Sequence, residues 1–133
     1  MNILFLCVGN SARSQMAEGL AKSYFGKEAK VMSAGSQPTG EVHPVAIQVL
    51  GEMNIDIADY RSKSVTEIPQ SFIDQLDYVV TLCAEEVCPV IPSTAKKLQW
   101  AFNDPAKAPE HDIVPYFRLV RDGIIDQLKA LDS

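Results

Sequence analysis

The chain has 133 residues, of which 47% are hydrophobic and 22% charged, the composition of one globular domain with one core. A formal net charge of −5 argues against nucleic acid as a partner, and no apolar run approaches the ~20 residues of a membrane span. The N-terminus lacks the basic segment of a signal peptide, so we expect a cytoplasmic protein with no membrane association. Three cysteines cannot all pair, and a reducing compartment would keep them as thiols, so catalysis or redox cycling is the better use for them.

Apolar residues and turn signals divide the first half of the chain into strand, helix, strand and helix. The apolar run Ile3–Leu6 predicts a buried strand. Helical spacing of apolar residues predicts a helix from about Ser14 to Phe25, which Gly26 ends. Val31–Ala34 is typical of a short strand, and Pro44 suits the first turn of a second helix.

The second half begins with a helix signal and continues with two strands. Ser64 and Glu67 have the spacing of a capping box, which favours a helix start, and Pro69 should keep that helix short or irregular. Residues Tyr78–Leu82 are apolar or β-branched throughout, as in a strand buried on both faces. Residues 97–102 predict a weaker strand.

A long final helix completes the expected fold. Residues 113–131 carry apolar side chains near helical spacing. The order of elements indicates an α/β fold with a parallel sheet and right-handed crossovers, formed by residues 1–133 as a single domain. In open parallel sheets, ligands bind outside the carboxyl ends of the strands. Cys7, Cys83 and Asp104 each follow a predicted strand, so we expect them to converge at that edge.

The residues after the first strand form a compact motif, Cys7-Val8-Gly9-Asn10-Ser11-Ala12-Arg13-Ser14. Gly9 permits a tight bend, and Asn10 tolerates a left-handed backbone. The amides of such a turn and of the following helix start point at one spot, which is an anion site. Arg13 adds a planar fork suited to a tetrahedral oxyanion, and Ser14 either caps the helix or bonds to the sulfur of Cys7. The amide dipoles and the guanidinium both favour a thiolate at Cys7.

A simpler interpretation is that Cys7 is a small buried residue at the end of a strand, as free cysteines often are. A cysteine followed by five residues and then Arg-Ser, between an apolar strand and a helix, is much more specific than that. A nucleotide-binding P-loop would instead need Gly-Lys-Ser/Thr at its end.

Cys83, Cys88 and Asp104 are further candidates, each with a competing structural interpretation. Cys83 could be inert core packing at a strand end, and zinc binding by the two cysteines lacks a Cys-x-x-Cys pattern or a nearby histidine. On an ideal helix, residues five apart face nearly opposite ways, so a disulfide between them requires an unwound segment. Asp104 before Pro105 would alone indicate an ordinary turn, and His43 is interpreted as a helix cap or surface residue.

The motif from Cys7 to Ser14, continued by Gln15-Met16-Ala17-Glu18, resembles the low-molecular-weight protein tyrosine phosphatase superfamily and, within it, the thioredoxin-coupled arsenate reductases. The resemblance extends through Ser33-Ala34-Gly35, Val80-Thr81-Leu82-Cys83 and Asp104-Pro105. It implies a four-stranded parallel sheet in the order 2-1-3-4.

The resemblance also implies a mechanism of arsenate reduction. Cys7 attacks arsenic while the loop amides and Arg13 hold the oxygens, and Asp104 protonates the departing oxygen. Cys83 then attacks Cys7 and releases arsenite, and Cys88 moves the disulfide to Cys83–Cys88 for reduction by thioredoxin or glutaredoxin. The spacing of the two later cysteines is shorter than in the best-known branch, so the role of Cys88 is the less certain of the two.

The chain departs from the family at two places near the motif. Ala12 stands where many of these reductases have a further cysteine. Some members bind potassium beneath the loop, and Asn10, Glu18 and Ser33 match that site, but Arg61 and Lys63 replace its Thr and Asp ligands. We hypothesise that the Lys63 ammonium takes the cation's place, so that no metal is needed; the alternative is that both are solvated surface charges. The residues expected to support the loop are Asn10, Ser14, Glu18, Ser33 and Lys63.

Two other functions compete with arsenate reduction. One is a phosphatase for phosphotyrosine or small phosphoesters that uses Cys7, Arg13 and Asp104; the absence of aromatic residues directly after Asp104-Pro105 counts against phosphotyrosine. The other is a redox sensor based on Cys83 and Cys88. We expect a monomer that binds arsenate, with phosphate or sulfate as mimics, and nothing in the sequence argues for a tightly held cofactor.

Overall fold

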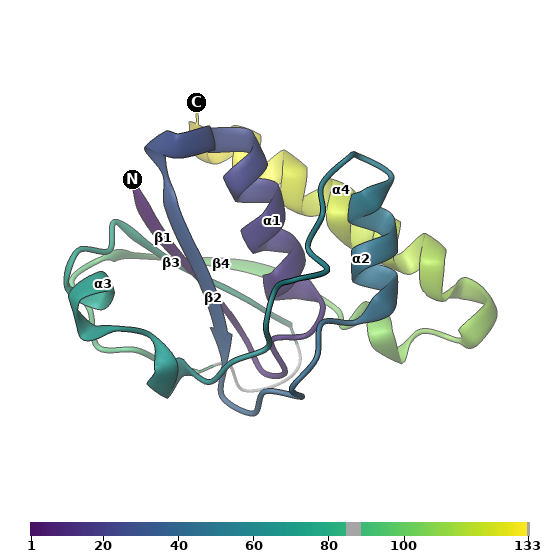
Figure 1. Cartoon of the computed structure of the whole chain (residues 1–133), viewed down its shortest axis with the longest axis horizontal. Coiled ribbons are helices and arrows are strands. Elements are labelled where there is room, and N and C mark those ends of the chain that lie inside the picture. Colours follow the sequence, from purple (N-terminus) through teal and green to yellow (C-terminus); the bar gives the residue numbers. More distant parts are fainter. Residues whose placement is uncertain (85–88, 133) are drawn as a thin grey trace.

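Figure 1 shows the computed structural model, which describes residues 1–84 and 89–132. Its four strands are β1 (Asn2–Cys7), β2 (Lys30–Gly35), β3 (Tyr78–Cys83) and β4 (Lys96–Phe102). They form one parallel sheet in the order β2-β1-β3-β4. The expected α/β fold and strand order are confirmed, and each strand lies within one or two residues of its prediction.

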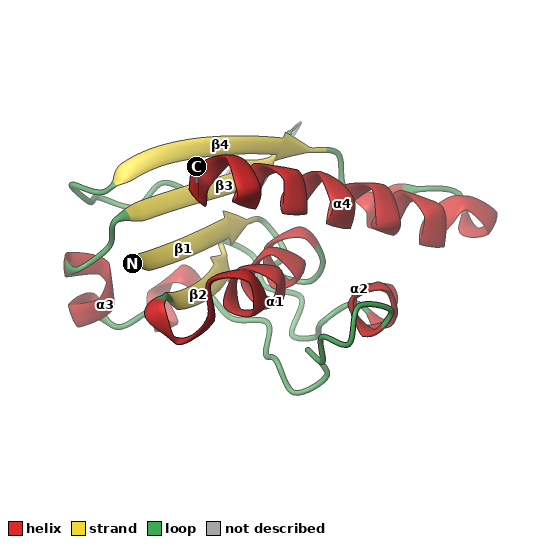
Figure 2. Cartoon of the chain, turned by 90° about the horizontal axis from the view of Figure 1, so that it is seen from above, coloured by secondary structure: helices red, strands yellow, loops and turns green. Residues whose placement is uncertain are grey.

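Helices cover both faces of the sheet (Figure 2). The helices are α1 (Arg13–Phe25), α2 (Pro44–Gly51), α3 (Gln70–Asp74) and α4 (Ile113–Asp132). One cluster of buried side chains joins α1, α2 and α4 to one face of the sheet. A smaller cluster on the other face includes partly buried side chains of α3.

The capping box is present but does not begin an α-helix. Ser64 Oγ accepts from the N–H of Thr66, and Glu67 accepts from the N–H of Ser64 at 2.7 Å, around a 3₁₀ turn of three residues (Val65–Glu67). Pro69 stops this turn because it has no N–H and disfavours helical geometry at Ile68. Helix α3 therefore starts afresh at Gln70.

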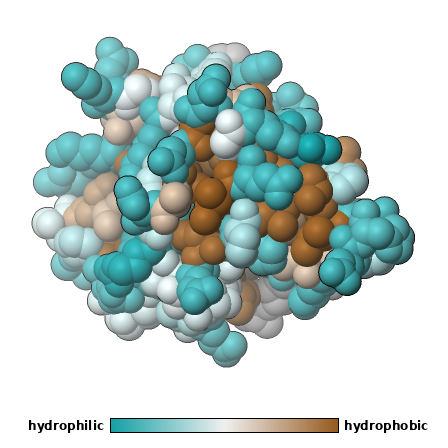
Figure 3. Space-filling model, turned by 45° about the vertical axis from the view of Figure 1, so that its right-hand side comes forward, coloured by the Kyte–Doolittle hydropathy of each residue, from teal (hydrophilic) through white to brown (hydrophobic). Residues whose placement is uncertain are grey.

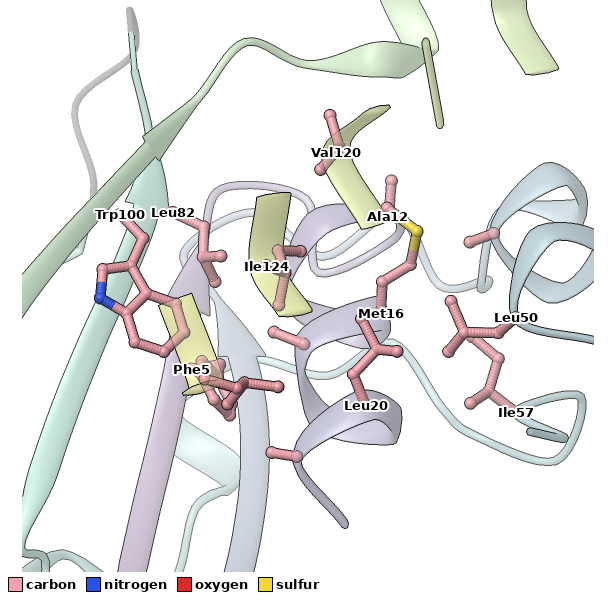
Figure 4. Close-up of a cluster of buried hydrophobic side chains, with 14 of the residues drawn as sticks. Phe5, Ala12, Met16, Leu20, Leu50, Ile57, Leu82, Trp100, Val120 and Ile124 are labelled. Atoms are coloured by element: carbon pink, nitrogen blue, oxygen red, sulfur yellow. The ribbon is translucent and has the colours of Figure 1, made fainter. Parts of the chain in front are cut away.

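Strand β1 lies at the centre of the core, because it has a neighbouring strand on each side and helices or loops over both faces. Ile3 and Phe5 face the helical layer, where Phe5 packs against Trp100 with ring centroids 5.8 Å apart (Figure 4). Leu4 and Leu6 face the smaller cluster. These four side chains are fully buried, which explains why the sequence of β1 is apolar without alternation.

The helical side carries hydrophobic surface between its polar groups. Figure 3 shows hydrophobic atoms near the middle of a largely hydrophilic face. Ile47 and Ile55 are only partly buried against the main cluster. None of the helices in the described part of the chain is long and apolar enough to cross a membrane.

The parallel arrangement brings the ends of three strands together. The arrowheads of β1, β3 and β4 lie at the same edge of the sheet (Figure 2). Cys7 is the last residue of β1, Cys83 is the last residue of β3, and Asp104 follows shortly after β4. The fold thus brings these candidate residues to one edge, as expected.

Candidate active site

Cys7 lies buried at the start of the loop between β1 and α1. Its Sγ accepts a hydrogen bond from the backbone N–H of Asn10 at 3.2 Å and lies 2.8 Å from Ser14 Oγ. Ser14 does not cap α1, whose N-cap is Ala12 without a side-chain cap. Of the two roles expected for Ser14, the structure therefore supports the bond to sulfur, and both donors would stabilise a thiolate.

Asn10 links the loop to its surroundings. Its φ of 45° is left-handed, as predicted for this position. Its Nδ2 donates to Ser14 Oγ at 2.8 Å and to Ser33 Oγ at 3.0 Å. Its Oδ1 accepts from the backbone N–H of Lys63 and from Gln15 Nε2, both at 2.9 Å. Both polar atoms of the Asn10 side chain therefore form hydrogen bonds. They connect the loop to β2 through Ser33, to α1 through Ser14 and Gln15, and to Lys63, the residue before the capping box.

The outer side of the loop is held by the segment that follows β2. The carbonyl oxygens of Val8, Gly9 and Ser11 accept hydrogen bonds of 2.9–3.0 Å from backbone N–H groups in residues 37–43. Gly35 makes this packing possible, because a Cβ there would lie 2.3 Å from Val8 O. These bonds occupy carbonyls of the loop, while the N–H of Asn10 points toward Cys7 Sγ, as in the predicted anion site.

Arg13 is a buried cation at the first turn of α1. Its Nη1 donates to Phe102 O at 2.7 Å and to Leu82 O at 3.4 Å. These carbonyls belong to the ends of β4 and β3, so the guanidinium is fixed against the edge where the strands converge. A preorganised guanidinium loses little entropy when it binds an oxyanion.

Cys7, Arg13 and Asp104 line one cavity of about 200 Å³, which has room for a tetrahedral oxyanion. Asp104 Oδ1 accepts from the N–H of Ala106 at 3.0 Å, which holds the carboxyl group at the rim. The remaining lining residues are Gly9, Asn10, Ser11, Ala12, Thr39, His43 and Ala106. A cavity of about 290 Å³ over β3 and β4 contains none of the candidate residues, so we place the site in the smaller one.

Of the two later cysteines, Cys83 lies within the described part of the chain. Cys83 is buried at the end of β3, the neighbour of β1, with Leu6 opposite Thr81 in the register. It therefore reaches the same edge as Cys7, although it does not line the cavity. Cys88 lies outside the described residues.

A charge cluster around the buried carboxylate of Glu18 lies beneath the loop. Ser33 Oγ donates to Glu18 Oε1 at 2.6 Å, and Lys22 Nζ lies 2.7 Å from Glu18 Oε2. Lys63 Nζ lies 3.7 Å from Glu18 Oε1, and its side chain is only 12% exposed. Burial lowers the pKa of Lys63, and the charge of Glu18 opposes that shift. The Lys63 ammonium therefore lies beside the Glu18 carboxylate, whereas Arg61 is exposed and pairs with Glu67.

Thr39, His43 and Ala106 line the cavity without having been predicted from the sequence, and Gln15 supports the loop from outside it. His43 caps α2 as expected, since its Nδ1 accepts from the N–H of Val45 at 3.1 Å, but it also lines the cavity. Gln15 is fully buried, and its Nε2 binds Asn10 and the carbonyl of Arg61. The only sequence signal for either was proximity to a helix start or to the motif. Their contacts come from segments distant in the chain.

Comparisons with known proteins agree with this geometry. Residues 2–132 match the model of the family "Low molecular weight phosphotyrosine protein phosphatase". The chain is 46% identical over 132 residues to the arsenate reductase of Halalkalibacterium halodurans, covering 96% of this chain and 92% of that protein.

Solved structures give the same result. An arsenate reductase in the phosphate-binding state matches with a TM-score of 0.79 and 29% identity, over 98% of this chain and 95% of that one. The thioredoxin-dependent arsenate reductase Cg_ArsC1' of Corynebacterium glutamicum matches with a TM-score of 0.72 and 31% identity, over 98% of this chain and 61% of that one. These matches, together with a loop that carries Cys7 and Arg13 at the edge of this sheet, show that the chain belongs to the arsenate reductase branch of the low-molecular-weight phosphotyrosine protein phosphatase family.

Proposed function

We propose that this protein reduces arsenate to arsenite through Cys7, Cys83 and Cys88 and is recycled by an external dithiol protein of the thioredoxin type. The observation that carries the proposal is the cavity in which Cys7, Arg13 and Asp104 meet. The sequence match to arsenate reductases and the structural match to a thioredoxin-dependent one support the substrate and the donor.

The first step uses the three residues that line the cavity. The Cys7 thiolate attacks arsenic and forms an S–As bond, while Arg13 and the loop amides hold the other oxygens. One As–O bond breaks, and its hydroxyl oxygen leaves as water with a proton from Asp104. Arsenic is still As(V) in the resulting adduct.

The second step carries the electron transfer. The Cys83 thiolate attacks Cys7 Sγ, an S–S bond forms and the S–As bond breaks. Its electron pair stays on arsenic, which leaves as arsenite, As(III), while the two cysteines are oxidised. Support for this step is the placement of Cys83 at the end of the strand beside β1.

The last steps regenerate the enzyme. Cys88 attacks Cys83, expels Cys7 as a thiolate and leaves a Cys83–Cys88 disulfide, which the external dithiol then reduces. Such a cycle requires thiols that are kept reduced between turnovers, so we also propose that the protein works in the cytoplasm.

Beneath the loop, we propose that Lys63 stabilises the Glu18 carboxylate in place of a metal cation. A cation beside that carboxylate would meet the like charge of Lys63, whose Nζ is 3.7 Å from Glu18 Oε1. The proposed reaction therefore uses only protein side chains and the external dithiol.

Arsenite formation in the presence of thioredoxin, thioredoxin reductase and NADPH tests the proposal. The wild type should turn over, Cys7→Ser should form no arsenite, and Cys83→Ser should bind arsenate without completing a cycle. Replacing the thioredoxin system by glutathione and glutaredoxin identifies the donor, and Cys88→Ser shows whether the third cysteine is needed. Sustained turnover by Cys83→Ser would contradict the relay.

The family match also favours a second candidate, a phosphatase for small phosphoesters. Cys7, Arg13 and Asp104 would suffice for it, and no step would involve Cys83. Ala106 lines the cavity next to Asp104, where an aromatic ring would be needed to hold a phosphotyrosine. Hydrolysis of p-nitrophenyl phosphate by the wild type and by Cys83→Ser alike, without arsenite formation by either, would favour the phosphatase.

A further inference from the structure

His43 reaches the cavity from a different part of the chain than the oxyanion loop does. It precedes α2 and lines the same cavity as Cys7 and Asp104. Its backbone N–H donates to the carbonyl of Ser11 at 2.9 Å, which anchors it directly to the loop. The reaction steps proposed above leave this side chain without a role.

The orientation of the His43 ring is fixed on two sides. Its Nδ1 accepts the N–H of Val45 at 3.1 Å, and its ring packs against Phe117 with centroids 4.8 Å apart and planes at 37°. A ring nitrogen that accepts a hydrogen bond carries no proton, so the neutral ring has its hydrogen on Nε2. No described residue accepts a hydrogen bond from Nε2. This N–H is the donor that remains for a molecule in the cavity.

The surroundings keep this imidazole neutral near pH 7. Burial lowers the pKa of His43, and the carboxylate of Asp104 only partly opposes that shift. The cavity is also lined by Cys7 and the guanidinium of Arg13, while α4 contributes the uncharged ring of Phe117. A proton on Nδ1 would also remove the cap of α2, because two N–H groups would then face each other.

We infer that His43 binds the substrate oxyanion directly, by donating Nε2–H to one of its oxygens on the side of the cavity that Asp104 lines. The identity of the oxyanion as arsenate, with phosphate as its mimic, rests on the proposed function. His43 thus complements Arg13: the guanidinium supplies charge from α1, and the imidazole supplies a neutral, directed donor from the segment before α2.

The substitution His43→Asn separates binding from capping. Asparagine is among the best N-cap residues, so its Oδ1 can replace Nδ1 at the N–H of Val45, while the reach of the imidazole into the cavity is lost. His111→Asn is the matched control, because the side chain of His111 is 82% exposed and pairs with Asp112. The probe is inorganic phosphate, titrated calorimetrically into reduced protein.

For His43→Asn we expect phosphate binding to weaken about 10-fold, since a hydrogen bond to a charged group is lost. The KM for arsenate should rise by a similar factor while kcat stays within about twofold, the pattern of a contact made equally in the ground and transition states. The melting temperature of His43→Asn should fall only slightly, because the cap of α2 is kept and only the ring contact with Phe117 is lost, and His111→Asn should change none of these values.

Unchanged phosphate affinity in a folded His43→Asn protein would overturn the inference. If this variant does not fold, the imidazole resonances of the wild type decide: the ¹H–¹⁵N signal of Nε2 should shift on phosphate addition, and a signal that does not move overturns the inference. A wild type that neither binds phosphate nor forms arsenite would overturn the proposed function together with this inference. An active wild type with an unaffected His43→Asn overturns the inference alone.

Discussion

Two glutamates in this molecule each lie between two cations, yet their surroundings differ. Glu18 on α1 is flanked by Lys22 at 2.7 Å and Lys63 at 3.7 Å, and its side chain is 8% exposed. Glu52, at the end of α2, binds Arg118 at 2.6 Å and Arg121 at 2.7 Å and is 33% exposed. Both clusters join separate elements: α1 to the segment near the loop, and α2 to α4.

The two clusters differ most in what lies beyond the carboxylate. Hydrogen bonds run from Glu18 through Ser33 and Asn10 to Ser14 and on to the sulfur of Cys7. Glu52 has no such connection to the cavity among the contacts of the described residues. The same ionic arrangement therefore supports the reactive loop in one place and only helix packing in the other.

The largest effect should come from removing the buried carboxylate. Glu18→Ala leaves Lys63 without its counter-charge and Ser33 without its acceptor, so we expect the free energy of unfolding to fall by about 2 kcal/mol. This is less than for a fully buried pair, because Lys22 is 44% exposed. Arsenite formation should fall at least about 10-fold, since loss of preorganisation raises the barrier. Denaturant unfolding and steady-state kinetics measure both effects.

Glu52→Ala is the control for this prediction. Equal losses of activity in the two variants would show that Glu18 supports the loop around Cys7 no more than Glu52 does.

A double-mutant cycle tests the connection itself. Asn10→Ala and Glu18→Ala act on one hydrogen-bond network, so their effects on unfolding free energy should deviate from additivity by about 1 kcal/mol. Asn10→Ala combined with Glu52→Ala should be additive to within about 0.5 kcal/mol, because the sites share no partner. Additivity in both pairs would show that the contacts between Glu18 and the loop carry no energetic coupling.

Of the two lysines beside Glu18, the more buried one, Lys63, should contribute more to activity. Lys63→Met should lower arsenite formation several-fold, whereas Lys22→Met should have a smaller effect, because the exposed Lys22 is screened by solvent. If the ammonium of Lys63 serves in place of a cation, the wild type should be equally active in potassium and sodium salts of equal ionic strength. Strong activation of the wild type by potassium would refute that role.

The smallest effect should come from Glu52, and it should depend on pH. Hydrogen bonds from Arg118 and Arg121 lower the pKa of Glu52 from 4.5 to about 2. Because the folded-state pKa is the lower one, the stabilisation is complete above about pH 4.5 and is lost as the pH falls to about 2. The melting temperature of Glu52→Gln should lie slightly below that of the wild type at pH 7, and the two should converge below pH 4.5. A difference in melting temperature that grows as the pH falls would contradict the lowered pKa of Glu52. Activity at pH 7 should be unchanged.

The sequence was sufficient for the features that depend on local chemistry. The left-handed Asn10, the end of α1 at Gly26 and the start of α2 at Pro44 follow from residue types at fixed offsets. The strand order followed from the family resemblance and matches the structure. Pro69 also indicated that the helix after the capping box would be short or irregular, and the structure has a 3₁₀ turn there, followed by the five residues of α3.

The features that the sequence did not reveal depend on contacts between distant segments. His43 comes close to Cys7 because residues 37–43 fold back along the loop, and no periodicity encodes that path. The pairing of Glu52 with Arg118 and Arg121 requires the packing of α2 on α4. Lys63 was proposed from the resemblance, and its distance from Glu18 could only come from the structure.

The most direct test of the relay is to map the thiols of fully reduced protein after one equivalent of arsenate, with no external reductant present. The relay predicts one equivalent of arsenite and a disulfide that mass spectrometry assigns to Cys83–Cys88, with Cys7 free to react with an alkylating agent. A trapped Cys7–Cys83 bond would mean that the external donor attacks directly and that Cys88 is not needed. Absence of any disulfide, together with turnover of a phosphoester, would contradict the reductase and support the phosphatase.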